Sequence, residues 1–423
     1  MVHKKILHSG LRVVTVPMKN ANSVTVLILV GTGSKYETKD QNGMSHFLEH
    51  MFFKGTKKRP TTLKISETLD MIGGVYNAFT SKEVTGFWAK VDKKHADIAL
   101  DWISDMFLHS KFEEAEIERE KGVVIEELNM YLDMPSEYVG ELFESLLYRD
   151  QPAGWRIVGE KENILSFNRE KMLEYYKSHY ATDNTVICVA GDVNPKIIEE
   201  KIRAYFAKVK KNSFLTKPPT KELQQKPEAL FYQKTTDQTH FCLGVRAYNM
   251  FSPQKYALSL MAIMLGGNMS SRLFISVRER NSLAYYIHTS FDTTTDTGYL
   301  VTQAGIKNGN LEKAVALILQ EYQDIKNKKI TARELKKAKE YIRGTMALSL
   351  DATDAQASFF ATQEVMEGKM ISPEEKLKLI DKVSVRDIKK VAEDIFRPEK
   401  LNLSVIGSIE ESEQGKIKGI LTI

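Results

Sequence analysis

The sequence predicts an α+β fold of two similar halves, each combining a mostly antiparallel sheet with helices. Strand-like runs cluster with pairs of helical patterns between them, whereas a doubly wound parallel sheet alternates single strands with single helices. Similar elements also recur in the same order at a spacing of about 210 residues, which is typical of an internal repeat. Finally, 423 residues exceed one ordinary hydrophobic core and favour two or three domains.

The repeat rests on three matched pairs of segments. Thr85 and Thr297 each begin a Thr-Gly-aromatic strand start, 297 minus 85 or 212 positions apart, and an amphipathic helical pattern follows each of them. Both halves end on a similar apolar strand, in which Gly191 and Gly407 are 216 positions apart. Chance explains any single match between common patterns, but three matches in one order indicate duplication.

The individual elements follow from hydrophobic periodicity and from the residues that bound each run. Short runs rich in β-branched and aromatic residues predict strands at 11–17, 24–30, 85–91, 186–193, 231–233, 239–247, 289–293 and 298–305. Apolar residues at helical spacing predict helices at 44–53, 62–72, 93–109, 113–132, 171–179, 253–265, 310–326 and 332–350. A polar, proline-bearing stretch divides the halves, so we expect an N-terminal domain at 1–212, a linker at 213–228 and a C-terminal domain at 229–423.

Composition limits the environment and the partners of the chain. With 42% hydrophobic and 27% charged residues it resembles a soluble globular protein, and its longest apolar run, 26–30, is far shorter than the roughly 20 residues of a membrane span. No secretory leader is evident, so a cytoplasmic location is expected. The net charge of +5 is dispersed and forms no basic stripe, which argues against a nucleic-acid partner. Cys188 and Cys242 lie in apolar runs and are expected to be buried free thiols.

The most informative segment for function is His46-Phe47-Leu48-Glu49-His50, an inverted zinc-peptidase motif. On a helix, His46 and His50 lie one turn apart on the same face, so both imidazoles can reach one cation. Zinc held by three protein ligands keeps a position for water and lowers the pKa of that water, and Glu49 can take its proton. The alternative is an amphipathic helix with two histidines on its polar edge.

The predicted helix 113–132 offers several carboxylates as the third zinc ligand. Glu120 and Glu127 are seven residues apart and share a face, whereas Glu126 is turned by about 100°. Spacing alone does not choose among them, and a solvated acidic helix is the alternative interpretation.

Three segments, at 43–56, 73–85 and 118–127, resemble the pitrilysin family of zinc peptidases, which includes insulin-degrading enzyme and the mitochondrial processing peptidase. In that family a glutamate about 76 residues beyond the motif completes the zinc site, and here 127 minus 50 minus 1 gives 76. The resemblance therefore implies one zinc ion per chain on His46, His50 and Glu127, with Glu120 orienting the site.

The resemblance also implies how a peptide is held. Residues 270–285 are similar to the family's substrate-clamping segment, in which the residues matching Arg278 and Tyr285 contact the substrate near the scissile bond. Residues 77–86 resemble the edge strand on which an extended peptide aligns, so Asn77, Ala78 and Phe79 are expected to bind substrate. For Asn77 a role as a turn residue is the alternative.

The family arranges such halves as a hollow clamshell, and this chain supplies one pair of halves. The resemblance therefore implies half of a clamshell and a homodimer whose active site is completed across the interface. The expected function is a zinc endopeptidase that hydrolyses peptides or unfolded segments enclosed in a chamber, with Glu49 as general base. The alternative is a non-catalytic structural or substrate-holding relative. The presence of all ligand positions favours the enzyme.

Overall fold

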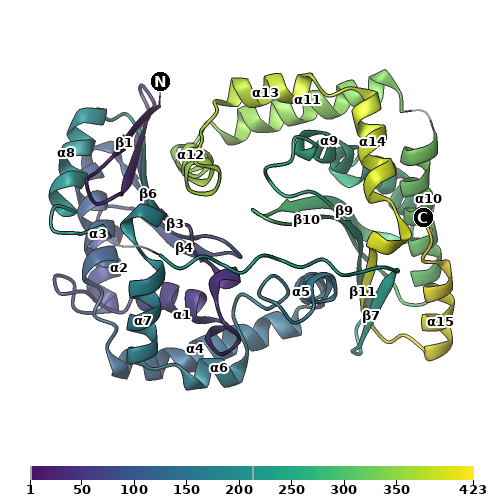
Figure 1. The fold of residues 1–423 in the computed structure, drawn as a ribbon, viewed down its shortest axis with the longest axis horizontal. Coiled ribbons are helices and arrows are strands. Elements are labelled where there is room, and N and C mark those ends of the chain that lie inside the picture. The colour runs from purple at the N-terminus through teal and green to yellow at the C-terminus, as the bar shows by residue number, and fades with distance from the viewer. Residues whose placement is uncertain (1, 212–213, 329) are drawn as a thin grey trace. The chain divides into compact units, whose positions relative to one another are not determined.

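The computed structural model describes residues 2–211, 214–328 and 330–423, so the expected domain boundary between 212 and 213 lies outside the described residues (Figure 1). The chain forms two compact units, each built from three segments. Unit 1 contains Met1–Leu128, Arg156–Pro218 and Met346–Ile371, and unit 2 contains Asn129–Trp155, Pro219–Thr345 and Ser372–Ile423.

Unit 1 is built on a six-stranded sheet in the order β1-β2-β6-β3-β5-β4. Only the pairing of β2 with β6 is parallel. The strands span His3–Ile6 (β1), Arg12–Pro17 (β2), Ser23–Val30 (β3), Val75–Thr80 (β4), Thr85–Asp92 (β5) and Thr185–Gly191 (β6). The Val- and Ile-rich strands β3 and β6 lie in the interior of the sheet, while β4 forms one edge.

Helices cover both faces of this sheet. Helices α3 (Ala96–His109) and α8 (Pro195–Tyr205) lie on one face, and α12 (Thr353–Glu367) packs on the other (Figure 1). Phe360 of α12 packs with Leu27, Leu29 and Cys188 of the strands. The N-terminal half also contains α1 (Met44–Met51), α2 (Thr62–Asp70), α4 (Glu114–Asp133), α6 (Lys161–Ser166) and α7 (Arg169–His179).

Unit 2 repeats this topology in a five-stranded sheet of order β7-β11-β8-β10-β9. The strands span Glu228–Gln233 (β7), Gln238–Arg246 (β8), Ala284–Thr293 (β9), Gly298–Lys307 (β10) and Leu401–Gly407 (β11), and only β7 pairs with β11 in parallel. Apart from β1, each strand of unit 1 has a counterpart at the same place in this order. The predicted α+β architecture with two mostly antiparallel sheets is confirmed.

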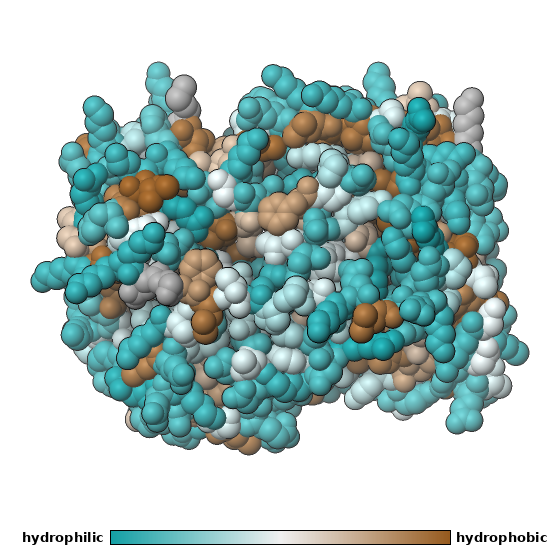
Figure 2. All heavy atoms as spheres, in the orientation of Figure 1, coloured by the Kyte–Doolittle hydropathy of each residue, from teal (hydrophilic) through white to brown (hydrophobic). Residues whose placement is uncertain are grey.

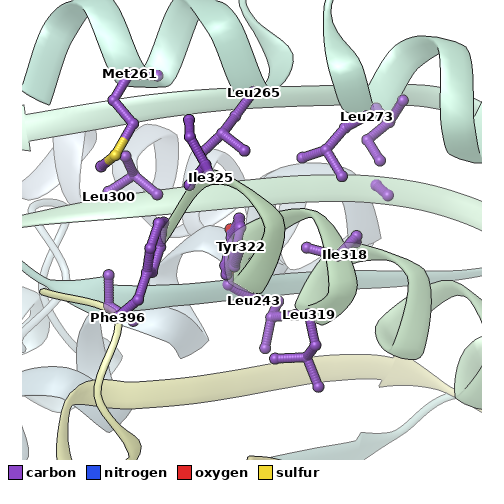
Figure 3. Packing of buried hydrophobic residues seen from close by; sticks show 14 of the residues in the cluster. Leu243, Met261, Leu265, Leu273, Leu300, Ile318, Leu319, Tyr322, Ile325 and Phe396 are labelled. Atoms are coloured by element: carbon purple, nitrogen blue, oxygen red, sulfur yellow. The ribbon is translucent and has the colours of Figure 1, made fainter. Parts of the chain in front are cut away.

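The core of unit 2 lies between its sheet and helices α9 (Lys255–Gly266), α10 (Leu311–Asn327) and α14 (Val385–Ile395). Figure 3 shows Ile318, Tyr322 and Ile325 of α10 directed toward side chains of the sheet and of α9. The ring of Tyr322 stacks on Phe396 with centroids 4.5 Å apart, and its buried hydroxyl donates to the carbonyl of Leu243 at 3.1 Å. Helices α11 (Ala332–Ser349), α13 (Pro373–Asp381) and α15 (Glu411–Ile420) complete the C-terminal half.

Two helices are exchanged between the halves of the sequence. Helix α5 (Pro135–Tyr148) belongs to the first half but packs on β8 and β11 of unit 2, with Val139 and Phe143 against Cys242 and Val301. Helix α12 belongs to the second half but covers the sheet of unit 1. Each half of the chain therefore supplies the helix that buries the second face of the other half's sheet.

Most apolar side chains and both cysteine thiols are buried in the cores of the two units. The face drawn in Figure 2 is mainly hydrophilic, and its hydrophobic side chains lie singly or in small groups. Within the described ranges, no helix has the length and apolar character needed to cross a bilayer. Cys188 and Cys242 are free and buried, as predicted.

Candidate metal centre

The start of α1 is fixed by a glycine and a buried carboxylate. Gly43 adopts a positive φ of 100°, and a Cβ at this position would lie 2.5 Å from the carbonyl oxygen of Val158, so only glycine fits. The carboxylate of Glu37 accepts hydrogen bonds from the backbone amides of Gly43 and Ser45 at 2.8 and 2.7 Å. Burial raises the pKa of Glu37 to about 7, although these hydrogen bonds oppose the shift.

Helix α1 presents its two histidines on one side because its apolar face is anchored in the core. Phe47, Leu48 and Met51 are fully buried. The imidazole rings of His46 and His50 lie with their centroids 4.7 Å apart, as predicted for residues one helical turn apart.

Glu127 of α4 faces both rings. Its Oε1 lies 3.6 Å from Nε2 of His46, and its Oε2 lies 3.3 Å from Nε2 of His50. One ligand atom from each residue can be chosen so that all lie within 4.8 Å of one another. Tetrahedral zinc with bonds of about 2.0–2.2 Å holds its ligand atoms on the order of 3.3–3.6 Å apart. The two separations between the histidines and Glu127 lie at this spacing, so the donor set suits a zinc ion.

The electrostatics of these side chains also suit a cation. Burial alone would lower the pKa of His50, but hydrogen bonds to Glu120 and Glu127 outweigh it and raise the pKa to about 9. Hydrogen bonds from His46 and His50 hold the pKa of Glu127 far below its usual range. Without metal the group binds a proton tightly, and a divalent cation would replace that positive charge.

An ion pair between the buried Glu120 and the half-buried Lys54 contacts His50 on the side away from Glu127. Nδ1 of His50 lies 2.9 Å from Oε1 of Glu120, whose Oε2 lies 2.5 Å from Nζ of Lys54. Because Glu120 engages Nδ1, the ring is oriented with Nε2 toward Glu127, the usual arrangement behind a metal-ligating histidine. Burial alone would raise the pKa of Glu120, but the bonds from His50 and Lys54 hold it below its ordinary value. Lys54 was absent from the sequence prediction, because its partner Glu120 lies on α4, far away in the sequence.

Glu49 lies beside the ligands and has one strong hydrogen-bond donor. The hydroxyl of Thr80, the last residue of β4, donates to Oε2 of Glu49 at 2.6 Å. Burial raises the pKa of Glu49, while the bond from Thr80 and the charges of His46 and His50 act in the opposite direction. Sequence reasoning missed Thr80, because no local pattern links a strand residue to a helix 31 positions earlier.

Asn77, Ala78 and Phe79 lie on β4, which is an edge strand of the unit 1 sheet. Asn77 and Phe79 are exposed on one face, while Ala78 is half-buried on the face that also carries Thr80. The side-chain oxygen of Asn77 accepts a hydrogen bond from the amide of Ala78 at 2.9 Å. The expected edge segment 77–86 was too long, since β5 starts at Thr85 and pairs on both sides.

Arg278 and Tyr285 belong to unit 2, and each lies in a segment with irregular backbone geometry. Arg278 lies on a π-helix, Phe274–Arg280, and its guanidinium stacks over the Phe274 ring at 4.7 Å. Tyr285 lies in a β-bulge of β9, because Gly305 pairs with Tyr286 whereas Ile306 pairs with Ala284. The bulge turns the side chain outward, and it is 76% exposed.

Comparisons with known proteins identify the family of the chain. Residues 12–161 match the family described as Insulinase (Peptidase family M16), and residues 166–342 match the Peptidase M16 inactive domain. The uncharacterized zinc protease YmxG of Bacillus subtilis is 36% identical over 399 residues, covering 94% of this chain and 96% of that protein. A zinc protease of Rickettsia felis is 33% identical, covering 92% of this chain and 94% of its own length.

Solved structures show the same fold. A protease from Helicobacter pylori superimposes with a TM-score of 0.91 at 23% identity, covering 96% of this chain and 99% of that chain. The peptidase M16 inactive domain from Pseudomonas fluorescens superimposes with a TM-score of 0.88 at 16% identity, covering 97% of this chain and 98% of that chain. Together with the sequence matches, these likenesses show that the chain belongs to the M16 family of peptidases, the insulinase and pitrilysin family.

Proposed function

We propose that this chain is a zinc endopeptidase with its metal on His46, His50 and Glu127. The observation that carries the proposal is the convergence of these three side chains at zinc-ligand spacing, with the carboxylate of Glu49 beside them. Zinc held there supplies a Lewis acid that polarises the scissile carbonyl and lowers the pKa of a bound water.

In this proposal Glu49 removes the proton of the attacking water and passes it to the leaving amine. Its half-buried position raises its pKa, which suits a group that must both accept and release a proton. Glu120 and Lys54 keep His50 oriented during both steps.

The substrate is proposed to be an extended peptide or an unfolded segment. Edge strand β4 offers main-chain pairing that requires no particular sequence, and Asn77, Ala78 and Phe79 flank the bound chain. The half-buried guanidinium of Arg278 and the exposed phenol of Tyr285 suit a peptide carbonyl or a developing oxyanion.

Zinc content and cleavage of quenched fluorogenic peptides, with and without a chelator, test the function. We expect about one zinc per chain and turnover that the chelator abolishes. Glu49→Gln is expected to keep zinc and lose turnover, whereas Glu126→Gln, an exposed carboxylate on the same helix as Glu127, keeps both. Turnover by Glu49→Gln would exclude the mechanism. Zinc binding by the wild type without turnover of any library peptide would favour a non-catalytic relative.

We also propose a homodimer in which Arg278 and Tyr285 of one copy complete the zinc site of the other. Mixing Glu49→Gln chains with Tyr285→Phe chains tests this arrangement. A mixed dimer carries one site with both functional residues, so activity should recover to as much as about a quarter of wild type, the share expected from random pairing. Two inactive variants that stay inactive when mixed, or a monomer in light scattering that cleaves peptides, would refute it.

A further inference from the structure

The turn between β4 and β5 is held unusually firmly. Glu83 is buried, and its Oε1 lies 3.0 Å from Nζ of Lys35 and 3.3 Å from Nζ of Lys217. The amides of Ser34 and Lys35 donate to the carbonyls of Ser81 and Lys82 at 3.1 and 2.8 Å. These contacts fix the turn through both its backbone and its side chain.

The close approach at this turn depends on Gly33. A Cβ on Gly33 would lie 2.1 Å from the carbonyl oxygen of Ser81, so any side chain there would push the turn away. The short segment 33–37 also carries Glu37, which holds the N-terminus of α1. One segment therefore contacts both the helix that bears Glu49 and the turn that follows Thr80.

Thr80 lies between the fixed turn and the carboxylate. It is the last residue of β4, next to Ser81, and its hydroxyl donates to Oε2 of Glu49 at 2.6 Å. The backbone on one side and the helix on the other are both anchored, so the hydroxyl approaches the carboxylate from a fixed direction. A hydrogen bond to a carboxylate from such a donor restricts its rotation.

We propose that Thr80 is a positioning residue for the general base, and that it joins the peptide-binding edge strand to Glu49 in one hydrogen-bonded unit. The hydroxyl occupies Oε2, so Oε1 is the oxygen that takes the proton of the water. The inference rests on the proposed function. It adds a residue that acts through Glu49 without touching the metal or the substrate.

Thr80→Val and Thr80→Ser test this role. Valine keeps the shape of threonine and removes the hydroxyl, whereas serine keeps the hydroxyl. With quenched peptides, Thr80→Val should lower kcat by about 10- to 100-fold with KM within about twofold, because misplacing a catalytic group by about 1 Å costs on the order of a hundredfold. Thr80→Ser should restore kcat to within about threefold of wild type.

Two readouts are independent of turnover. Zinc affinity, measured by competition with a chromophoric chelator, should be the same for Thr80→Val and wild type within about twofold. Binding of a labelled peptide to Glu49→Gln and to the Glu49→Gln, Thr80→Val double variant, measured by fluorescence anisotropy, should also agree within about twofold.

The results separate this inference from the proposed function. The inference would be overturned by an unchanged kcat in Thr80→Val, or by a kcat of Thr80→Ser that is no higher than that of Thr80→Val. It would also be overturned by a matching loss of zinc affinity in Thr80→Val, or by weaker peptide binding in the double variant. A wild-type protein that binds zinc and cleaves no peptide would instead overturn the proposed function, and the wild-type turnover assay would show this before Thr80 is considered.

Discussion

Replacing Glu37 by glutamine is expected to remove a pH-dependent loss of stability from unit 1. Glu37 is only 2% exposed, and its pKa is about 7 in the folded chain against an ordinary value of 4.5. A carboxyl whose pKa is raised by folding binds its proton more tightly in the folded state. Its contribution to stability is therefore complete below pH 4.5 and is lost as the pH rises through 7.

The size of this loss follows from the two pKa values. One pKa unit corresponds to about 1.4 kcal/mol, so the full difference is about 3.4 kcal/mol, and about 2.5 kcal/mol of it develops between pH 5 and pH 8. For a unit of this size, 2.5 kcal/mol corresponds to a change in Tm of roughly 5–10 °C. Glutamine stays neutral throughout, so Glu37→Gln should become more stable relative to wild type by that amount over the same range.

Tryptophan fluorescence can follow unit 1 alone. Of the three tryptophans, Trp88 and Trp102 lie in unit 1 and Trp155 in unit 2, so the melts are compared in a Trp155→Phe background without metal. Asp92→Asn is the matched control, because Asp92 also lies in unit 1, is exposed, and has its pKa lowered by the hydrogen bond from the amide of Lys94. Its difference from wild type should not vary between pH 5 and 8. If the difference in Tm between Glu37→Gln and wild type is also constant between pH 5 and 8, the reasoning is refuted.

Three further outcomes are expected. Lys54→Met should weaken zinc binding by about tenfold in chelator competition, because Glu120 loses its cation and orients His50 less well. Lys54→Arg keeps the charge, so its zinc affinity should stay within about threefold of wild type. Equal losses of affinity in the two variants would contradict a role for the charge. Phe52→Ala should lower the free energy of unfolding of unit 1 by about 3–5 kcal/mol in urea, since five aromatic rings lie 4.6–6.3 Å from its ring; a loss under 1 kcal/mol would contradict this packing. Tyr285→Phe should leave Tm unchanged because the side chain is exposed, yet lower kcat/KM by at least about tenfold; full activity would remove Tyr285 from substrate binding.

Local patterns predicted the elements that carry their own signal. The strands near 11–17, 24–30 and 85–91 and the helices near 44–53 and 113–132 match the structure within a few residues. Helices α5 and α12 were not predicted, because each buries its apolar face against a sheet made by the other half of the chain. The π-helix was not predicted either, since an i to i+5 ladder has no distinct hydrophobic period.

The candidate site divides in the same way. Helical spacing placed His46 and His50 together, but it could not choose among the carboxylates of α4, and the family distance selected Glu127. The structure shows why Glu126 fails as a candidate, because it is exposed on a different face of the helix. Lys54 and Thr80 required the tertiary structure, since their partners Glu120 and Glu49 lie on other elements.

The two sheets share one strand order but differ in the side chains that they present. Edge strands β4 and β9 occupy the same place in the two strand orders. In unit 1 the first α-helix after strand β3 is α1, which carries His46, Glu49 and His50. Strand β4, which ends at Thr80, comes later in the chain. In unit 2 the corresponding helix is α9, which follows β8, and its sequence KYALSLMAIMLG contains no His, Cys, Asp or Glu. Strand β9 carries the exposed Tyr285. Because α9 is almost wholly apolar and buried, unit 2 cannot hold a metal at the equivalent position. One edge strand therefore carries the hydroxyl that binds the proposed base, while the other carries a bulge that exposes the phenol proposed to contact the substrate.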